Sequence, residues 1–252
     1  MKRSAILFMI VIIAFSCNSE QSHLKSDRET ANLKGNIWKI NKTIHNANGN
    51  CVCPAAMKTE CNQSQYVYDK KGNLLVSCTI DENGSVNDSS HYVYNRRGMC
   101  SEITNFSVGK FVGKEVPVLE KGRVTGVKMY NENGIIETTL NYVYSGDEIS
   151  EEKTINSNSE FVSSVQKEFL NGQLVSQTEK GNNGDVQIIR KFKRNPSNDI
   201  IENLIILPKD NKEYKFTYEY EYDSVGNWIK QTRFYDGQIE NIVIRNIEYF
   251  KS

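Results

Sequence analysis

The segment YVYDKKGN at Tyr66–Asn73 decides the fold, because it returns twice in nearly the same form. The second copy is YVYNRRGM at Tyr92–Met99, and the third is YEYDSVGN at Tyr220–Asn227. Two weaker copies, YVYSG and EFLNG, lie at Tyr142–Gly146 and Glu168–Gly172. The spacings fit a unit of about 25 residues, and fixed self-similarity of this length indicates a repeat architecture.

Each unit has the composition of a β-hairpin. In Tyr214–Asp223, aromatic residues occupy the even positions and polar or charged residues the odd positions, which predicts a strand with one apolar and one solvated face. The turn at Asp69–Gly72 ends on a glycine, which accepts a positive φ, and the next turn, at Asp81–Gly84, contains an Asn-Gly pair. Second arms are expected at Leu74–Ile80 and Trp228–Tyr235. The sequence therefore predicts an all-β fold of tandem hairpins without a helix of useful length.

The number of hairpins predicts how the sheet is shaped. About sixteen strands would form a single sheet roughly 75 Å wide, and open sheets of that width curl or fold on themselves. We therefore expect a curled, half-open antiparallel meander. A transmembrane barrel is disfavoured, because its outer face needs an uninterrupted apolar band and segments such as Gln187–Lys191 do not supply one.

The repeated motif resembles the tyrosine-aspartate (YD) repeat of RHS proteins, which has the form Tyr-x-Tyr-Asp-x-x-Gly-Asn. The resemblance is good over Gln65–Gly98 and Tyr218–Tyr235 and loose between them. Known RHS proteins wrap such hairpins into a large shell around a toxin, and a chain of 252 residues is too short to do so. The chain is most similar to small YD-repeat bacterial lipoproteins, and the resemblance implies hairpins without implying an activity.

The first residues indicate export. A cationic start is followed by the apolar run Ala5–Phe15, which is shorter than the 20 or so residues of a membrane-spanning helix. Ala14–Cys17 resembles a lipobox, so we expect a signal peptide over residues 1–16 and lipidation of Cys17. Because Ala14 and Phe15 depart from the usual lipobox residues, an ordinary secretory signal with a structural Cys17 is the alternative.

The chain after the signal divides into a tether and a folded body. Residues 17–34 are polar and lack hydrophobic periodicity, so we expect a flexible tether. Residues 35–252 are expected to form a single β-hairpin repeat domain. Asn18, by resemblance to known lipoprotein sorting, disfavours the inner membrane. The expected location is the cell envelope, lipid-anchored in the outer membrane, with either face possible.

The charge balance argues against a nucleic-acid partner. The chain has 31 basic and 31 acidic residues, and 29 basic residues remain once Lys2 and Arg3 leave with the signal. A protein that binds nucleic acid needs a basic field to neutralise phosphates. No such field exists here.

The five cysteines after Cys17 fit an oxidising compartment, and their odd number leaves at least one thiol unpaired. In a meander the strands at Leu74–Ile80 and Met99–Phe106 flank Val86–Tyr94 and lie about 9.6 Å apart, too far for a disulfide. Cys78 should therefore not bridge to Cys100, which is expected to be a buried free thiol. Bridges are expected instead among four cysteines: Cys51, Cys53, Cys61 and Cys78.

A metal site is the alternative for the same cysteines. His45, Cys51, Cys53 and Cys61 could supply nitrogen and thiolate ligands. Structural zinc sites use wider Cys spacings than the pair at Cys51 and Cys53, and a second pair is missing. We expect neither a metal site nor a cofactor.

Tyrosines recur at the same place in their units and form a candidate binding face. Stacked in a sheet, they would line one face, where exposed rings would suit a glycan or a peptide strand. The other reading, which we favour, is that they form the core of the curled sheet. The residues are Tyr66, Tyr68, Tyr92, Tyr94, Tyr142, Tyr144, Tyr218, Tyr220 and Tyr222.

Motifs that carry a recognisable chemistry are missing from the sequence, including Gly-x-Ser-x-Gly, His-Glu-x-x-His and a phosphate-binding loop. The acids Asp69, Asp81, Asp223 and Asp236 stand at turn starts, where capping of the turn explains them. We expect a non-catalytic binding or scaffold module, held at the membrane by its lipid, with a glycan or a protein as partner. The alternative is an envelope enzyme that acts on glycans, which would need two close carboxylates in a pocket.

Overall fold

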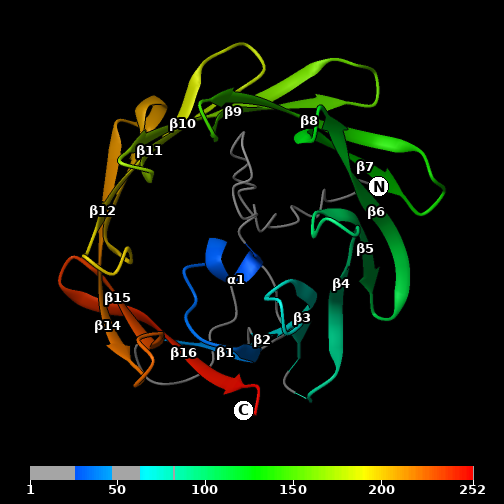
Figure 1. Cartoon of the computed structure of the whole chain (residues 1–252). Helices are drawn as coiled ribbons and strands as arrows, with labels where there is room; N and C mark the ends of the chain where they lie inside the picture. Colours follow the sequence, from blue (N-terminus) through cyan, green and yellow to red (C-terminus); the bar gives the residue numbers. More distant parts are fainter. Residues whose placement is uncertain (1–25, 47–62, 82, 252) are drawn as a thin grey trace.

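The computed structural model describes residues 26–46, 63–81 and 83–251, whose strands form a closed antiparallel barrel (Figure 1). Each strand pairs with its neighbour in sequence, and β1 pairs with β16. In chain order the elements are α1 (Asp27–Thr30), β1 (Ile37–Asn46), β2 (Gln63–Tyr68), β3 (Leu74–Ile80), β4 (Val86–Tyr94), β5 (Cys100–Ser107), β6 (Lys110–Glu120), β7 (Arg123–Asn131), β8 (Ile136–Ser145), β9 (Glu148–Asn156), β10 (Phe161–Leu170), β11 (Gln173–Lys180), β12 (Val186–Arg194), β13 (Ile200–Leu207), the 3-10 helix η1 (Pro208–Asp210), β14 (Lys212–Tyr222), β15 (Trp228–Tyr235) and β16 (Gln238–Tyr249).

The structure confirms the hairpins that the repeat predicts. β3 and β15 have the predicted bounds, and Gly72, Gly98 and Gly226 lie in turns with positive φ. α1, of four residues, is the longest helix in the described ranges. The all-β prediction is confirmed.

The prediction of a half-open meander is wrong, because the sheet closes on itself. Nearly every residue of β1 has a partner on β16, from Ile37 opposite Tyr249 to Asn46 opposite Asn241. The backbone amide of Phe250 extends this pairing by donating to Asn36 O at 2.8 Å. An open sheet would leave two edges of unpaired N–H and C=O groups, and closure removes both.

Asp and Asn side chains hold the turns between strands. Asp81 Oδ1 accepts from the backbone amides of Asn83 and Ser85, at 2.9 and 2.8 Å. Asp223 Oδ1 makes the same contacts with the amides two and four residues later. These bonds explain why the repeat carries Asp or Asn directly after its aromatic arm.

A second repeated contact ties adjacent strands together at one end of the barrel. The hydroxyls of Tyr144 and Tyr220 donate to the carbonyl of the residue 20 positions earlier, at 2.6 and 2.7 Å. The Tyr94 hydroxyl lies 2.7 Å from the corresponding carbonyl of Leu74, and it shares its single proton between this oxygen and Asp27 Oδ2. The acceptors, near the start of the preceding strand, are Leu74, Val124 and Ile200. In the divergent copy at β12, Arg194 Nε replaces the hydroxyl and donates to Leu174 O at 3.3 Å.

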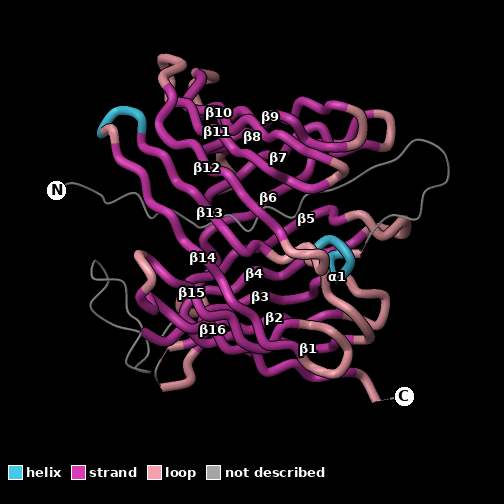
Figure 2. Tube along the Cα trace, turned by 90° about the vertical axis from the view of Figure 1, so that its left-hand side faces the viewer, coloured by secondary structure: helices cyan, strands magenta, loops and turns pink. Residues whose placement is uncertain are grey.

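The segment before β1 packs at this same end, so that α1 lies inside the ring of strands (Figure 1) near one opening of the barrel (Figure 2). A capping box between Ser26 and Glu29 begins α1. Arg28 donates to Ile37 O and Lys70 O, at 3.1 Å each. The described part of the expected tether, residues 26–34, is therefore packed onto the barrel, which differs from the flexible chain that its polar composition indicates.

The largest buried cluster lies beneath this segment. Leu33 joins Ile37, Ile40, Tyr68 and Leu74 in one apolar core. One buried cluster thus forms where the N-terminal segment meets β1, β2 and β3, while other buried apolar residues, such as Val127, Leu140 and Phe216, lie on strands around the barrel. None of the helices in the described residues is long and apolar enough to cross a membrane.

Candidate functional site: the barrel lumen

The tyrosine ladder faces the lumen. Tyr94 marks the inner face, because its hydroxyl donates to Asp27 Oδ2 of α1 at 2.5 Å. Side chains alternate between the two faces of a strand, and residues paired across neighbouring strands point to the same face. Following these pairs from Tyr94 around the barrel therefore shows which residues of each strand face the lumen. All nine ladder tyrosines fall on the inner side. Their burial differs: Tyr68 is 6% exposed and belongs to the core, whereas Tyr222 is 37% exposed.

A cavity at this face, called the larger cavity below, has a volume of about 910 Å³. It is lined by the end of α1 and by residues of β9 to β16, including Glu148 of β9, together with Ile44 of β1. Aromatic side chains supply one part of its wall: Phe169, Tyr218, Tyr220 and Trp228. Neutral amides supply another: Gln173, Gln177, Gln231 and Asn241.

Hydrogen bonds fix the aromatic wall. The rings of Tyr220 and Trp228 are 5.9 Å apart between centroids. Gln231 Nε2 donates to the hydroxyl of Tyr220 at 2.9 Å, while that hydroxyl donates to Ile200 O. Burial raises the pKa of Tyr220 to about 12, so the hydroxyl stays neutral at physiological pH. The wall therefore offers flat rings held in place by polar neighbours.

Two of the cations that line the larger cavity, Arg233 and Lys167, are in ion pairs. Arg233 forms an ion pair with Glu240 at 2.6 Å and lies over the ring of Phe216. Lys167 faces Glu152 at 3.8 Å, with both side chains less than a tenth exposed. Burial raises the pKa of Glu152 and lowers that of Lys167, because both charges leave water.

The smaller cavity, of about 280 Å³, lies against the other part of α1. Its apolar lining includes Leu33, Ile40 and Leu74, and its charged lining is Asp27, Lys42 and Arg245. Burial lowers the pKa of Arg245 to about 10, which leaves the guanidinium charged at neutral pH. Thr30 and Ala31 line both cavities, so α1 forms a wall of each.

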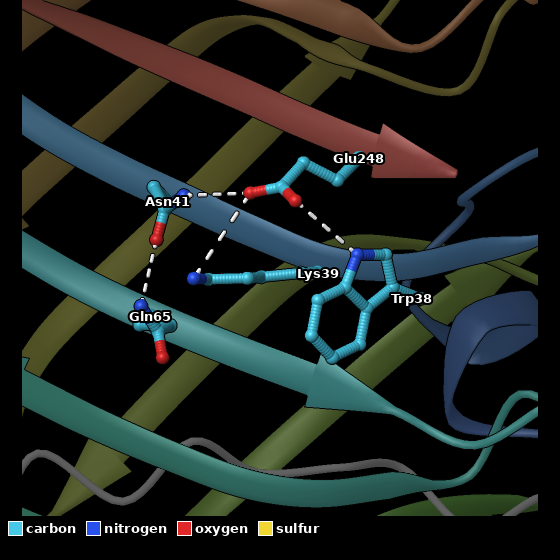
Figure 3. A network of polar contacts seen from close by, with 5 residues as sticks. All are labelled: Trp38, Lys39, Asn41, Gln65 and Glu248. Carbon is cyan, nitrogen blue, oxygen red and sulfur yellow. Dashed lines mark hydrogen bonds and ion pairs between the residues drawn. The ribbon is translucent and has the colours of Figure 1, made fainter. Parts of the chain in front are cut away.

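The outer face of the barrel is charged along its circumference. Outward-facing ion pairs occur from β5 to β15. Four join neighbouring strands and one lies within β9: Lys114–Glu102, Lys193–Glu202, Lys215–Glu202, Lys230–Glu221 and, within β9, Lys153–Glu151, with distances of 2.6–3.2 Å. At the β1–β16 seam, Glu248 is surrounded by Trp38, Lys39 and Asn41, and Gln65 donates to Asn41 at 2.9 Å (Figure 3). Ion pairs thus recur on the outside, among exposed apolar side chains such as Val93, Val143 and Ile244, and the aromatic ladder lines the inside.

The other predicted site residues fall in two groups. Cys17, Cys51, Cys53 and Cys61 lie outside the described residues, as do residues 1–25. Cys78 and Cys100 form no disulfide with each other, as predicted; Cys100 is 2% exposed, which confirms its prediction as a buried hydrophobe, and burial raises its pKa to about 12. The predicted bridges of Cys78 remain predictions. In the described ranges, no cluster of His, Cys, Asp and Glu is large enough to hold a metal ion.

Sequence reasoning missed three parts of the lumen. The helix α1 carries a readable signal, because Ser26 and Glu29 have capping-box spacing. Trp228 follows a repeat glycine and was expected to be an ordinary strand residue. Lys42 and Arg245 become neighbours only through closure of the barrel, and the sequence carries no sign of that pairing.

No protein-family model matches the sequence, and no curated protein does either. Solved structures do resemble it. A porin-like protein from Bacteroides uniformis ATCC 8492 has a TM-score of 0.58 at 12% identity, with 84% of this chain and 96% of that chain covered. A porin-like protein from Bacteroides vulgatus ATCC 8482 has a TM-score of 0.51 at 11% identity, with 86% and 99% covered. At such identities the likeness concerns the fold alone.

A third structure, the Tc holotoxin pore of Photorhabdus luminescens, covers 70% of this chain and 10% of that chain at 14% identity. Its TM-score of 0.28 is too low to carry a structural argument. The resemblance to RHS/YD repeats therefore remains one of sequence motifs.

Proposed function

We propose that this chain is a lipid-anchored envelope protein whose barrel stays in water and binds a saccharide, without catalysis, in its lumen. The observation that carries the proposal is the larger cavity, where aromatic rings and neutral amides share one wall. Sugar rings present C–H groups that stack on aromatic faces, while their hydroxyls take hydrogen bonds from amides. Phe169, Tyr218 and Tyr220 supply the rings, and Gln177 and Asn241 supply amides.

The outer face argues against a barrel embedded in a bilayer. A Lys or Arg facing lipid at the middle of a membrane costs about 2–4 kcal/mol. Lys114 and Lys153 lie near the middle of β6 and β9, and their side chains face outward. The porin-like fold neighbours favour an envelope location, and the signal-like N-terminus favours attachment by a lipid rather than by the strands.

The enzymatic alternative is less well supported. Glycoside hydrolysis needs two carboxylates across the scissile bond, with the pKa of the acid raised. Burial raises the pKa of Asp27 and of Glu152, but Asp27 accepts hydrogen bonds from Leu74 and Tyr94, and Glu152 faces Lys167. Neither carboxyl lines the larger cavity. Its lining acids are Glu29, Glu148 and Asp199, of which Glu29 Oε2 accepts from the Ser26 amide and Asp199 Oδ2 accepts from the Tyr222 hydroxyl.

A matched pair of tyrosines tests saccharide binding. Tyr218 lines the cavity, while Tyr130 faces outward beside Lys114. Calorimetry of the mature chain against soluble neutral and N-acetylated oligosaccharides should show binding that Tyr218→Ala weakens at least tenfold and Tyr130→Ala leaves unchanged. Failure of every saccharide to bind, or equal losses in both variants, would overturn the proposal. Release of reducing ends during the titration would favour the enzyme.

The anchor has a separate test. Cys17→Ala should move the protein from the membrane fraction to the soluble fraction or block its processing. Unchanged membrane association together with unchanged mature size would refute lipidation at Cys17. That result would leave binding in the lumen untouched.

A further inference from the structure

The two faces of the β1–β16 seam differ in how their charges are balanced. On the outer face, Glu248 accepts hydrogen bonds from Trp38 and Asn41 and lies 4.0 Å from Lys39 Nζ (Figure 3). A carboxylate thus stands among the donors on the outside. The inner face of the same strand pair carries two cations instead.

Lys42 of β1 and Arg245 of β16 are direct cross-strand partners on the inner face. Like charges directly opposite each other in a sheet are destabilising. Among the ion pairs of the described residues, none includes Lys42 or Arg245. The barrel therefore closes over two cations that form no ion pair among the described residues, and the carboxylate of Asp199 acts on Arg245 only at longer range.

Aromatic rings hold these cations without using up their hydrogen-bond donors. The Arg245 guanidinium carbon lies 3.2 Å from the ring centroid of Trp228, and Lys42 Nζ lies 5.9 Å from that of Tyr66. A guanidinium stacked by its face keeps its N–H groups in the plane, where they can meet a carboxylate two at a time. The rings thus orient Arg245 and leave its edge available.

The acid in the same cavity does not neutralise the cations. Asp27 Oδ2 accepts from Leu74 N at 2.7 Å and from the Tyr94 hydroxyl at 2.5 Å. Burial raises the pKa of this carboxyl, which disfavours its charge. Its contacts tie α1 to β3 and β4 and are directed away from β16.

Apart from Thr30, the rest of the lining is apolar or aromatic, with Leu33, Ile40 and Tyr68 as examples. A volume of about 280 Å³ is near the lower end of small-molecule pockets. We propose that this cavity binds a small monocarboxylate with a short apolar tail, its carboxylate between Lys42 and Arg245 and its tail against Ile40 and Leu33. The proposal stands apart from saccharide binding, since Lys42 and Arg245, which would hold the carboxylate, line the smaller cavity and not the larger one.

The experiment uses hexanoate as the probe and hexanamide as its neutral isostere, with the full mature chain. Hexanoate should raise the Tm and bind in calorimetry, whereas hexanamide should do neither. Lys42→Met should weaken hexanoate binding at least tenfold and, in the absence of ligand, raise the Tm, because the repulsion is removed. A purely structural lysine would instead lower the Tm when replaced.

Lys39→Met is the matched control, since Lys39 lies on the outer face of the same strand. It should bind hexanoate with wild-type affinity. Equal binding of hexanamide, full hexanoate affinity in Lys42→Met, or equally tight binding of inorganic phosphate would overturn the proposal. The saccharide titration of Tyr218→Ala is read separately, so failure of one proposal does not imply failure of the other.

Discussion

Gly72 has two roles: it forms the turn of its repeat unit, and it contacts the segment that carries α1. The turn requires a positive φ at this residue, which is +95°, and the Gly72 carbonyl accepts a hydrogen bond from the Arg28 amide at 3.0 Å. A Cβ placed there would lie 2.5 Å from Arg28 Nε and 2.7 Å from Ser26 Oγ. Gly98 has the same place in the next unit and a φ of +80°, but a Cβ placed there would have no other atom within 4 Å.

Comparing these two glycines measures what α1 contributes. Gly98→Ala should cost about 1–2 kcal/mol from the left-handed backbone alone. Gly72→Ala should cost a further 1–3 kcal/mol or so, because Arg28 must move and its charged hydrogen bonds weaken. Urea denaturation of both variants gives the difference. Equal losses would show that the α1 segment adds no stability.

Asp27 and Glu202 respond to pH in opposite directions. Burial raises the pKa of Asp27, so its contribution to folding falls as the pH rises above about 4. Hydrogen bonds from Lys215 and Lys193 lower the pKa of Glu202, so its contribution is present at neutral pH and lost as the pH falls.

Denaturation between pH 4 and pH 7 or so separates the two effects. The stability of Asp27→Asn relative to wild type should rise with pH, and that of Glu202→Gln should fall. Identical pH slopes in wild type and Asp27→Asn would show that the carboxyl is not perturbed by burial.

At the scale of the element, the repeat is a hairpin fastened by a tyrosine. The aromatic arm alternates, Asp or Asn begins the turn, and the last tyrosine reaches back to the preceding strand. The bounds of β3 and β15 could be predicted from the sequence because every one of these signals is local. The hydroxyl-to-carbonyl bonds could not, since they depend on how far adjacent strands are offset.

Tyr144→Phe tests the hydrogen bond from the tyrosine hydroxyl to the carbonyl of the preceding strand. The Tyr144 hydroxyl donates to Val124 O at 2.6 Å, and its loss should cost about 0.5–1.5 kcal/mol. The ring and the Arg123 guanidinium 4.0 Å above it remain in place. Tyr214→Phe, on an inward position of β14, is the control and should change stability little. An equal effect of the two substitutions would contradict a role for the hydroxyl.

At the scale of the whole molecule, closure depends on a pairing that the repeat does not encode. β1 precedes the first repeat copy and lacks its motif, yet it meets β16 along most of its length. Residues about 200 positions apart, such as Lys42 and Arg245, are brought together only at this seam. The candidate site was therefore predictable in its tyrosines, whose periodicity is local, and not in its cations.

A chain ending at Tyr235, which lacks β16, tests what closure contributes. Its removal would expose the edges of β1 and β15, and free edges pair with other chains. We expect this chain to self-associate or to lose its cooperative unfolding transition, as seen by light scattering and thermal denaturation. A chain ending at Phe250 keeps the whole β1–β16 ladder and its Asn36 contact, so it should remain a monomer with wild-type Tm. If the shorter chain is also a monomer with wild-type Tm, the seam adds no stability and the closed barrel is not what sets the fold.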